Sequence, residues 1–249
     1  QTNPGVIALP EHNPQAVGAP ERTEITVLQL FKRRKRYNYV FIFTYGRSGS
    51  TLLMGLLNSL PHYCIRGENN NLLYRLYWSS EALNSALASP SAKNAAKPTN
   101  PWFGLDSTNP ARFNERLIEA FVDDVLAPGR DHTTVGFKEI RFSQNEVPDF
   151  EGYIAFVRRS FPGCKIIFNH RNLTDVAAGK WWSTMPAAPE KLQFIEDRFN
   201  SVPSGPDVLH FDYDRIDDGL DHVRELFTFL GERFDEAAVR QVLSVRHSY

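Results

Sequence analysis

From about residue 37 onward, short apolar runs alternate with longer segments in which apolar residues recur every three or four positions. The short runs are rich in β-branched and aromatic side chains, which is typical of strands buried in a parallel sheet. The longer segments are typical of helices that pack one face against a core. This alternation predicts an α/β fold with a mostly parallel central sheet.

The predicted strands are the short apolar runs, at residues 39–45, 62–68, 133–142, 164–170 and 207–213. The predicted helices are the longer amphipathic segments, at residues 50–60, 70–87, 111–126, 151–161, 173–182, 189–202, 219–231 and 234–243. Pro61 ends the first of these helices, because a proline cannot continue the backbone hydrogen bonding.

Some stretches do not follow this pattern. Residues 1–24 are rich in Pro, Asn, Gly and Ala, and we expect a loosely packed arm followed by a single domain over residues 25–249. The basic run Lys32–Arg36 fits either a nucleic-acid or targeting patch or a solvated lead-in to the first strand, and its isolation in a neutral chain favours the second. The stretch 88–106, rich in Ala, Ser, Asn and Pro, predicts a mobile loop or lid.

The composition narrows the class of protein. The chain has 249 residues, 42% of them hydrophobic, which fits one large globular domain or one domain with an insertion. Its formal net charge of −1 creates no overall attraction to nucleic acid or to an anionic membrane, so any anion must be bound by local groups. No apolar run approaches the roughly 18 residues that an integral membrane segment requires.

Cys64 and Cys164 both fall in runs that we expect to be buried strands. The sequence does not exclude a bridge, but two lone cysteines in a chain of this size suit a reducing, cytoplasmic compartment. The chain starts at Gln1, so the lack of a signal-peptide pattern carries little weight. Neither cysteine has a CxxC partner and the histidines lack ligand spacing, so we expect no metal site.

The segment "VFIFTYGRSGSTLL" at residues 40–53 predicts a strand, a glycine-containing loop and a helix. Backbone N–H groups and a helix N-terminus then meet at the loop, and both attract anions. Gly46 and Gly49 allow close approach of the backbone, and Arg47 offers a forked guanidinium suited to phosphate or sulfate oxygens. The loop also carries three hydroxyl donors, Ser48, Ser50 and Thr51.

The loop lacks the parts that bind a γ-phosphate. A nucleoside-triphosphate loop reads G-x-x-x-x-G-K-[ST], and with Gly49 as its second glycine this sequence has Thr44 and Ser50 where Gly and Lys are needed. The strand ending at His170 also lacks the terminal Asp that would hold magnesium. The remaining interpretations are another anion site, a metal-dependent nucleotide or small-molecule kinase without its usual residues, and an ordinary tight turn.

Three segments resemble the sulfotransferases that use 3′-phosphoadenosine 5′-phosphosulfate (PAPS), and most of all their tyrosylprotein branch. They are "TYGRSGSTLL" at 44–53, "IIFNHRNLTDVAAGKWW" at 166–182, and "VLHFDYDRI" with "LFTFLG" at 208–231. The resemblance implies a three-layer, P-loop nucleotide-kinase-like fold. It also implies transfer of a sulfuryl group without a metal, and 3′,5′-diphosphoadenosine as the product.

The resemblance also implies a set of nucleotide-binding residues. Those that would hold the 5′-phosphosulfate are Arg47, Ser48, Gly49, Ser50 and Thr51. Arg171 would bind the 3′-phosphate, unless it only pairs with Asp175 on the surface. The family usually has a serine eight residues later, where this sequence has Gly179, and Lys180 or the Gly179 N–H would have to take its place.

The residues expected to accept the proton and to stabilise charge lie near the strand ends. Glu68 resembles the general base of the tyrosylprotein branch, and a carboxylate at a strand end can accept the proton of an attacking hydroxyl. Lys138 and Arg47 would stabilise charge on the leaving phosphate. His170 is a rival base.

Other interpretations of these residues remain open. Glu68 could instead pair with Arg66 or Arg75, and Lys138 could belong to an ion network with Glu139 and Arg141. A non-catalytic nucleotide-binding module is a further alternative. The aromatic residues that could stack on adenine, line the acceptor pocket or simply form core are Trp102, Phe103, Trp181 and Trp182.

The acceptor hydroxyl or amine is not identified by the sequence. A small molecule, carbohydrate, lipid or peptide would each fit, and we expect the stretches 88–106 and 183–207 to carry its specificity.

Overall fold

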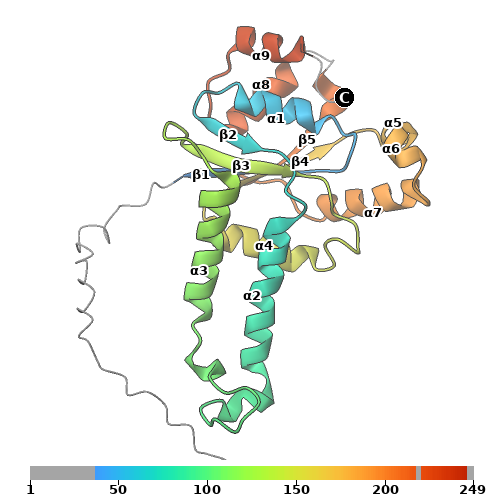
Figure 1. Cartoon of the computed structure of the whole chain (residues 1–249). Helices are drawn as coiled ribbons and strands as arrows, with labels where there is room; N and C mark the ends of the chain where they lie inside the picture. Colours follow the sequence, from blue (N-terminus) through green and yellow to red (C-terminus); the bar gives the residue numbers. More distant parts are fainter. Residues whose placement is uncertain (1–36, 217–219, 246–249) are drawn as a thin grey trace, which may run out of the picture. The chain divides into compact units, whose positions relative to one another are not determined.

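The computed structural model describes residues 37–216 and 220–245 (Figure 1). The predicted arm at 1–24 and the basic run Lys32–Arg36 lie outside these ranges. Within them the chain forms a five-stranded sheet with strand order β2-β3-β1-β4-β5. Every neighbouring pair of strands is parallel, which confirms the predicted α/β class.

The strands are close to those predicted. They are β1 (Asn38–Phe43), β2 (Tyr63–Arg66), β3 (Thr134–Glu139), β4 (Lys165–His170) and β5 (Val208–Asp212). β1 is the central strand, and at its carboxyl end Phe43 lies opposite Glu139 of β3 and Phe168 of β4. The parallel pairing brings the carboxyl ends of all five strands to one edge of the sheet.

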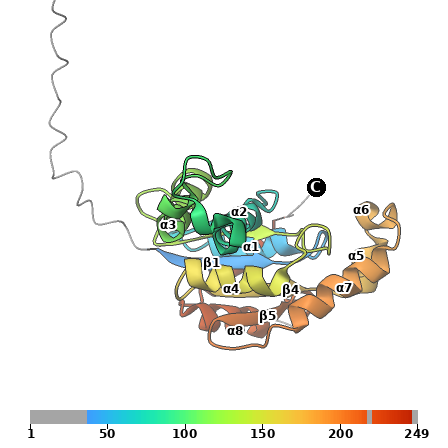
Figure 2. The same cartoon turned by 90° about the horizontal axis from the view of Figure 1, so that it is seen from below.

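Helices cover both faces of the sheet and make three layers (Figures 1 and 2). The upper face in Figure 1 carries α1 (Ser50–Asn58), α8 (Asp221–Leu230) and α9 (Glu236–Leu243). The lower face carries α2 (Leu72–Ala88), α3 (Pro110–Ala120), α4 (Phe150–Ser160) and α7 (Ala188–Asn200). The short helices α5 (Leu173–Ala178) and α6 (Lys180–Ser183) lie beyond the end of the sheet and close to α7.

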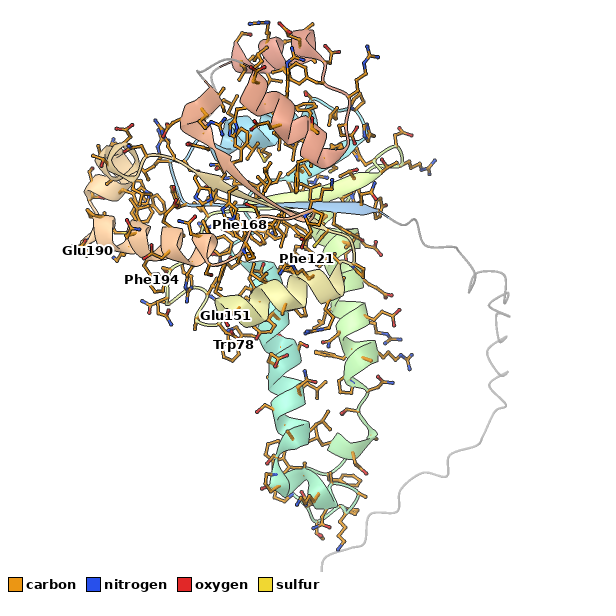
Figure 3. The ribbon with its side chains drawn as sticks, turned by 180° about the vertical axis from the view of Figure 1, so that it is seen from behind. Trp78, Phe121, Glu151, Phe168, Glu190 and Phe194 are labelled. Carbon is orange, nitrogen blue, oxygen red and sulfur yellow. The ribbon has the colours of Figure 1, made fainter. Side chains whose placement is uncertain are left out.

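The period-two pattern of β1 explains why both faces are covered. Phe41 and Phe43 point into the core on the α2, α4 and α7 side, whereas Val40 and Ile42 point into the core beneath α1 and α8. A strand that is apolar on both faces is stable only when both are buried. In Figure 3, Phe121 and Phe168 lie between the sheet and the lower helices, while Trp78 and Phe194 reach the surface on that side.

Residues 88–106, predicted as a mobile loop or lid, connect two long helices that project from the sheet; we call this projection the α2–α3 arm. α2 and α3 lie side by side and project away from the sheet, and the tip contains the 3₁₀ helices η2 (Pro90–Asn94) and η3 (Leu105–Ser107) (Figure 1). Local polar contacts order it, because the Ser89 hydroxyl caps η2 and the Gly104 N–H donates to the Ala95 carbonyl at 2.8 Å. The tip lies at the end of the arm away from the sheet.

Two predicted helices are interrupted. The helix expected at 111–126 becomes a π-helix, η4 (Phe121–Leu126), where Arg66 donates to the carbonyls of Leu126 and Ala127. The helix expected at 173–182 breaks at Gly179, whose backbone is extended. Side-chain contacts from distant parts of the chain cause the first change, and the sequence pattern does not contain them.

Cys64 lies in β2 as expected, whereas Cys164 precedes β4 by one residue. Both are buried and neither forms a disulfide. Within the described residues, no helix combines the length and apolarity needed to cross a membrane.

Candidate active site

The residues predicted to bind and react lie at the carboxyl edge of the sheet. The loop Thr44–Gly49 follows β1, Glu68 follows β2 and Arg171 follows β4, while Lys138 lies near the end of β3. In open parallel sheets this edge is the usual place for ligands, because the loops after neighbouring strands meet there. The topology therefore gathers residues that are far apart in the sequence, such as Arg47 and Arg171 at 124 positions.

The loop after β1 has an unusual backbone. Arg47 and Gly49 have φ angles of 71° and 77°, both in the left-handed region. That region is unfavourable for a bulky residue such as arginine, and such outliers concentrate at functional sites. Gly49 is the N-cap of α1 and no side chain caps that helix, so its first N–H groups can bind an anion.

A buried polar cluster supports the loop from below. The Thr44 hydroxyl lies 2.7 Å from both the Ser48 hydroxyl and the Asn169 carbonyl oxygen. The Asn169 amide donates to the Ser48 carbonyl at 3.0 Å. The Ser48 hydroxyl, expected to face the ligand, is fully buried and contacts Thr44 instead.

Aromatic rings pack directly against both glycines of the loop. A Cβ atom at Gly49 would lie 2.0 Å from the ring of Tyr213, and one at Gly46 would lie 1.9 Å from the ring of Trp181. Trp182 is buried and its indole N–H donates to the Gly46 carbonyl at 2.8 Å. The glycines are therefore required for close packing of the loop, in addition to any approach of a ligand.

Arg171 joins the two anion-binding segments predicted from the sequence. Its Nη1 donates to the Arg47 carbonyl at 3.0 Å, and its guanidinium carbon lies 4.9 Å from the centre of the Tyr213 ring. Its acidic neighbour is Asp214, at 3.5 Å from Nε, and not Asp175. Nε is buried and has no hydrogen-bond partner in the described part of the chain. Nε is therefore ion-paired with Asp214 without a hydrogen bond, and a guanidinium placed beside this loop suits a phosphate oxygen.

Tyr45 fixes the backbone of Arg171. Its hydroxyl donates to the Arg171 carbonyl at 3.0 Å and accepts the Arg171 N–H at 2.9 Å. Burial, together with the charge of Glu196, raises the pKa of Tyr45 far above its usual range, so the hydroxyl keeps its proton. Tyr45, Asn169 and Tyr213 are not among the residues predicted from the sequence, although Tyr45 and Asn169 each lie within two residues of a predicted binding residue.

The structure gives a reason for glycine at position 179. A Cβ atom there would lie 3.0 Å from the Val176 carbonyl oxygen and 3.4 Å from Cγ of Arg47, which is tight for a serine. The Gly179 N–H donates to the same Val176 carbonyl at 3.0 Å. Lys180 is exposed at the start of α6. The side chain next to position 179 is therefore that of Arg47.

Glu68 lies in an ion network. Its carboxylate accepts from Lys138 Nζ at 2.6 Å and from Arg141 Nη1 at 3.1 Å. The partners considered from the sequence, Arg66 and Arg75, are not the ones it pairs with. Lys138 is buried, whereas the Glu68 side chain is 31% exposed and so accessible to a ligand.

His170 has both ring nitrogens engaged. Nδ1 lies 2.8 Å from the Glu196 carboxylate and Nε2 lies 2.8 Å from Nδ1 of His210, whose Nε2 lies 2.8 Å from the Val202 carbonyl. Nε2 of His210 must donate to the Val202 carbonyl, because a carbonyl can only accept. Nδ1 of His210 therefore accepts the proton on Nε2 of His170. The contact between Nδ1 of His170 and the Glu196 carboxylate then requires a proton between these two groups. No nitrogen of His170 is left to take a proton from an acceptor, which disfavours it as the base.

No group of three or more His, Cys, Asp or Glu side chains suited to a metal ion occurs within residues 37–216 and 220–245.

Comparison with protein-family models matches the chain to the sulfotransferase family over residues 39–236. The match spans most of the chain, and the protein belongs to the sulfotransferase family. It is an enzyme of the sulfotransferase type. A search of curated proteins finds no match.

Two solved sulfotransferase domains are similar to this chain, and the first of them supports the fold. The sulfotransferase domain from the Synechococcus PCC 7002 olefin synthase is similar over 86% of this chain and 80% of that domain, with 18% identity and a TM-score of 0.50. The sulfotransferase domain from the curacin biosynthetic pathway is similar over 85% and 80%, with 17% identity and a TM-score of 0.48. The fold is the three-layer P-loop nucleotide-kinase-like fold expected from the sequence.

Proposed function

We propose that the enzyme transfers a sulfuryl group from PAPS to a hydroxyl or amine acceptor. The observation that carries this proposal is the junction of Arg171 with the loop after β1, where Arg171 Nη1 donates to the Arg47 carbonyl at 3.0 Å. This contact supports the proposal, because it joins the two segments proposed to bind the phosphates at the 3′ and 5′ positions of the nucleotide. The proposed product is 3′,5′-diphosphoadenosine.

The donor is held by the residues around this junction. In the proposal, the N–H groups at the start of α1 and the side chains of Arg47, Ser50 and Thr51 bind the 5′-phosphosulfate. Ser48 and Gly49 contribute backbone N–H groups. The Arg171 guanidinium binds the 3′-phosphate. Lys180, which is exposed, completes that subsite, and Gly179 leaves room there for the Arg47 side chain.

PAPS supplies an activated sulfuryl group whose bond to the bridging phosphate oxygen breaks as the acceptor bonds to sulfur. Glu68 accepts the proton that the attacking hydroxyl or amine releases. Lys138 and Arg47 stabilise the negative charge that develops on the leaving phosphate. Because Lys138 already contacts Glu68 at 2.6 Å, base and cation lie close enough to serve a single reacting group.

The test is a thermal-shift titration followed by turnover. We expect 3′,5′-diphosphoadenosine to raise the melting temperature in a concentration-dependent way, because it binds only the folded state, and ATP with magnesium to have little effect. Sulfate release or transfer from PAPS is then measured with panels of phenols, sugars, hydroxylated lipids and peptides. Stabilisation by ATP alone would favour the kinase interpretation and contradict this proposal.

A further inference from the structure

The loop that carries Glu68 has a conformation that the chain does not adopt without help. Asn70 and Asn71, which follow Glu68, have φ angles of 58° and 56°. Consecutive left-handed residues are uncommon outside glycine, although asparagine tolerates the region better than most. Inside the loop the Asn69 side-chain oxygen accepts the Leu72 N–H at 3.0 Å, while Asn71 itself makes no side-chain cap to α2. Contacts from outside the loop add to this one.

The group that holds the loop is the carboxylate of Glu139 at the end of β3. Its Oε2 accepts the backbone N–H of Asn71 at 2.8 Å and that of Asn69 at 3.4 Å. Its Oε1 accepts the backbone N–H of Ile140 at 2.9 Å and Nη1 of Arg141 at 3.1 Å. Glu139 is fully buried, so these bonds are what compensates the carboxylate for the loss of water.

Arg141 connects the buried carboxylate to the exposed one. The same Nη1 atom lies 3.1 Å from Glu139 and 3.1 Å from Glu68. The side-chain amide of Asn71 also donates to the Arg141 carbonyl at 2.6 Å, which ties the Glu68 loop to the end of β3 a second time. Glu139 thus reaches Glu68 by two routes, through the loop backbone and through Arg141.

We propose that Glu139 is a positioning residue for proton transfer, which fixes the direction in which the Glu68 carboxylate faces the acceptor. It touches no substrate, since it has no exposed surface. This inference rests on the proposed role of Glu68 as the base. The rival explanation is that Glu139 serves only the stability of the fold.

The variants are chosen to separate these explanations. Glu139→Gln keeps the size of the side chain but replaces one carboxylate oxygen with an amide N–H₂ group. Each of these oxygens accepts from two donors, so the hydrogen bonds made by the replaced oxygen are lost. Arg141→Met breaks the second route at a side chain that is 33% exposed, and so does not depend on a buried substitution being tolerated. Glu146→Gln is the control, because Glu146 also accepts a backbone N–H and a side-chain donor, but both come from Ser143, which is not a partner of Glu68.

The measurements are kcat, the affinity for 3′,5′-diphosphoadenosine and the melting temperature, for each variant alone and combined with Glu68→Gln. If Glu68 is the base, Glu68→Gln lowers kcat by roughly a hundredfold to ten-thousandfold. We expect Glu139→Gln and Arg141→Met to lower kcat about tenfold or more while nucleotide affinity stays within about twofold, and Glu146→Gln to change neither. In the Glu68→Gln background the same substitutions should cause almost no further loss, because they act through the side chain already removed.

Two results would overturn the inference. The first is a loss of kcat that has the same factor with and without Glu68, or that is matched by Glu146→Gln. The second is a Glu68→Gln variant with normal kcat, which leaves no base to be positioned while nucleotide binding and sulfuryl transfer persist. Failure of the proposed function itself looks different, because the unsubstituted enzyme then neither binds 3′,5′-diphosphoadenosine nor uses PAPS.

Discussion

Gly49 and Gly163 have the same φ angle of 77° but different surroundings. A Cβ atom at Gly163 meets nothing within 4 Å, whereas one at Gly49 overlaps the Tyr213 ring at 2.0 Å. We expect Gly163→Ala to lower the free energy of unfolding by about 1–2 kcal/mol, the cost of a left-handed alanine. Gly49→Ala should cost more, because Tyr213 must also move, and should weaken nucleotide binding. Urea unfolding measures the loss of stability, and calorimetric titration measures nucleotide binding. Equal losses of unfolding free energy in the two variants would show that the Tyr213 ring moves aside without cost.

Arg171 is the residue on which donor binding most depends. Loss of a partly buried charged hydrogen bond typically costs about 1.5–3 kcal/mol, so Arg171→Ala should weaken binding of 3′,5′-diphosphoadenosine roughly tenfold to a hundredfold. The matched control is Arg158→Ala, which removes an arginine paired with Asp207 at 2.9 Å away from the site. Isothermal calorimetry on both variants decides the matter. An unchanged affinity in Arg171→Ala would take this residue out of the donor site.

At the scale of elements, the chain Glu196–His170–His210 joins α7, β4 and β5. Burial lowers the pKa of His210 below its ordinary value, and the neighbouring His170 acts in the same direction. The unfolded chain takes up this proton near pH 6.5, and the folded protein only at lower pH. Below about pH 6.5 the unfolded state binds more protons, so the free energy of unfolding falls as the pH falls toward the lowered value.

This argument gives a measurable difference. The His210→Gln variant keeps a donor for the Val202 carbonyl but cannot titrate, so its stability should depend less on pH between about 5 and 6.5 than that of the unsubstituted protein. Urea unfolding across this range measures the slopes. Nitrogen-15 shifts of the imidazole ring should show His210 neutral with its proton on Nε2. Identical slopes, or a His210 that protonates near pH 6.5, would contradict the prediction.

The elements that the sequence predicts well are those set by local pattern. The runs "VFIFTY" and "KIIFNH" are apolar on both faces, and that property alone is typical of central parallel strands. The tip of the α2–α3 arm was expected to be a loop because Ala, Ser, Asn and Pro give no periodicity. Its 3₁₀ turns depend on single contacts, such as Gly104 to Ala95, which no periodic pattern contains.

The site divides in the same way. Arg47 and Arg171 could be predicted because Arg47 lies in the loop after β1 and Arg171 directly follows β4. A residue just beyond the end of a parallel strand lies at the carboxyl edge of the sheet. The supporting residues Tyr45, Asn169 and Tyr213 could not, because their roles arise from contacts across the sheet edge. The buried Ser48 hydroxyl shows the same limit, since the sequence places the residue in the loop but not the direction of its side chain.

At the scale of the whole molecule, the proposed reaction predicts independence of metal. The charge that develops during transfer is met by fixed cations and N–H groups, so sulfuryl transfer should keep nearly full activity after dialysis against EDTA. A kinase needs magnesium to bridge its phosphates and should lose nearly all turnover under the same treatment. Activity before and after EDTA, with magnesium added back, is the measurement. Complete loss restored by magnesium would favour the kinase.

The central position of β1 has a consequence for synthesis of the protein on the ribosome. Of the five strands in the described sheet β1 is made first, yet the strands that flank it begin only at Thr134 and Lys165. At typical translation rates the nascent chain spends roughly 5–20 seconds between completing β1 and starting β3, with an apolar strand unpaired on both edges. The nucleotide cannot help during this interval, because Asn169 and Arg171, which complete its loop, emerge later still. We therefore expect newly made chains to need protection of β1 against aggregation until β3 and β4 have been synthesised.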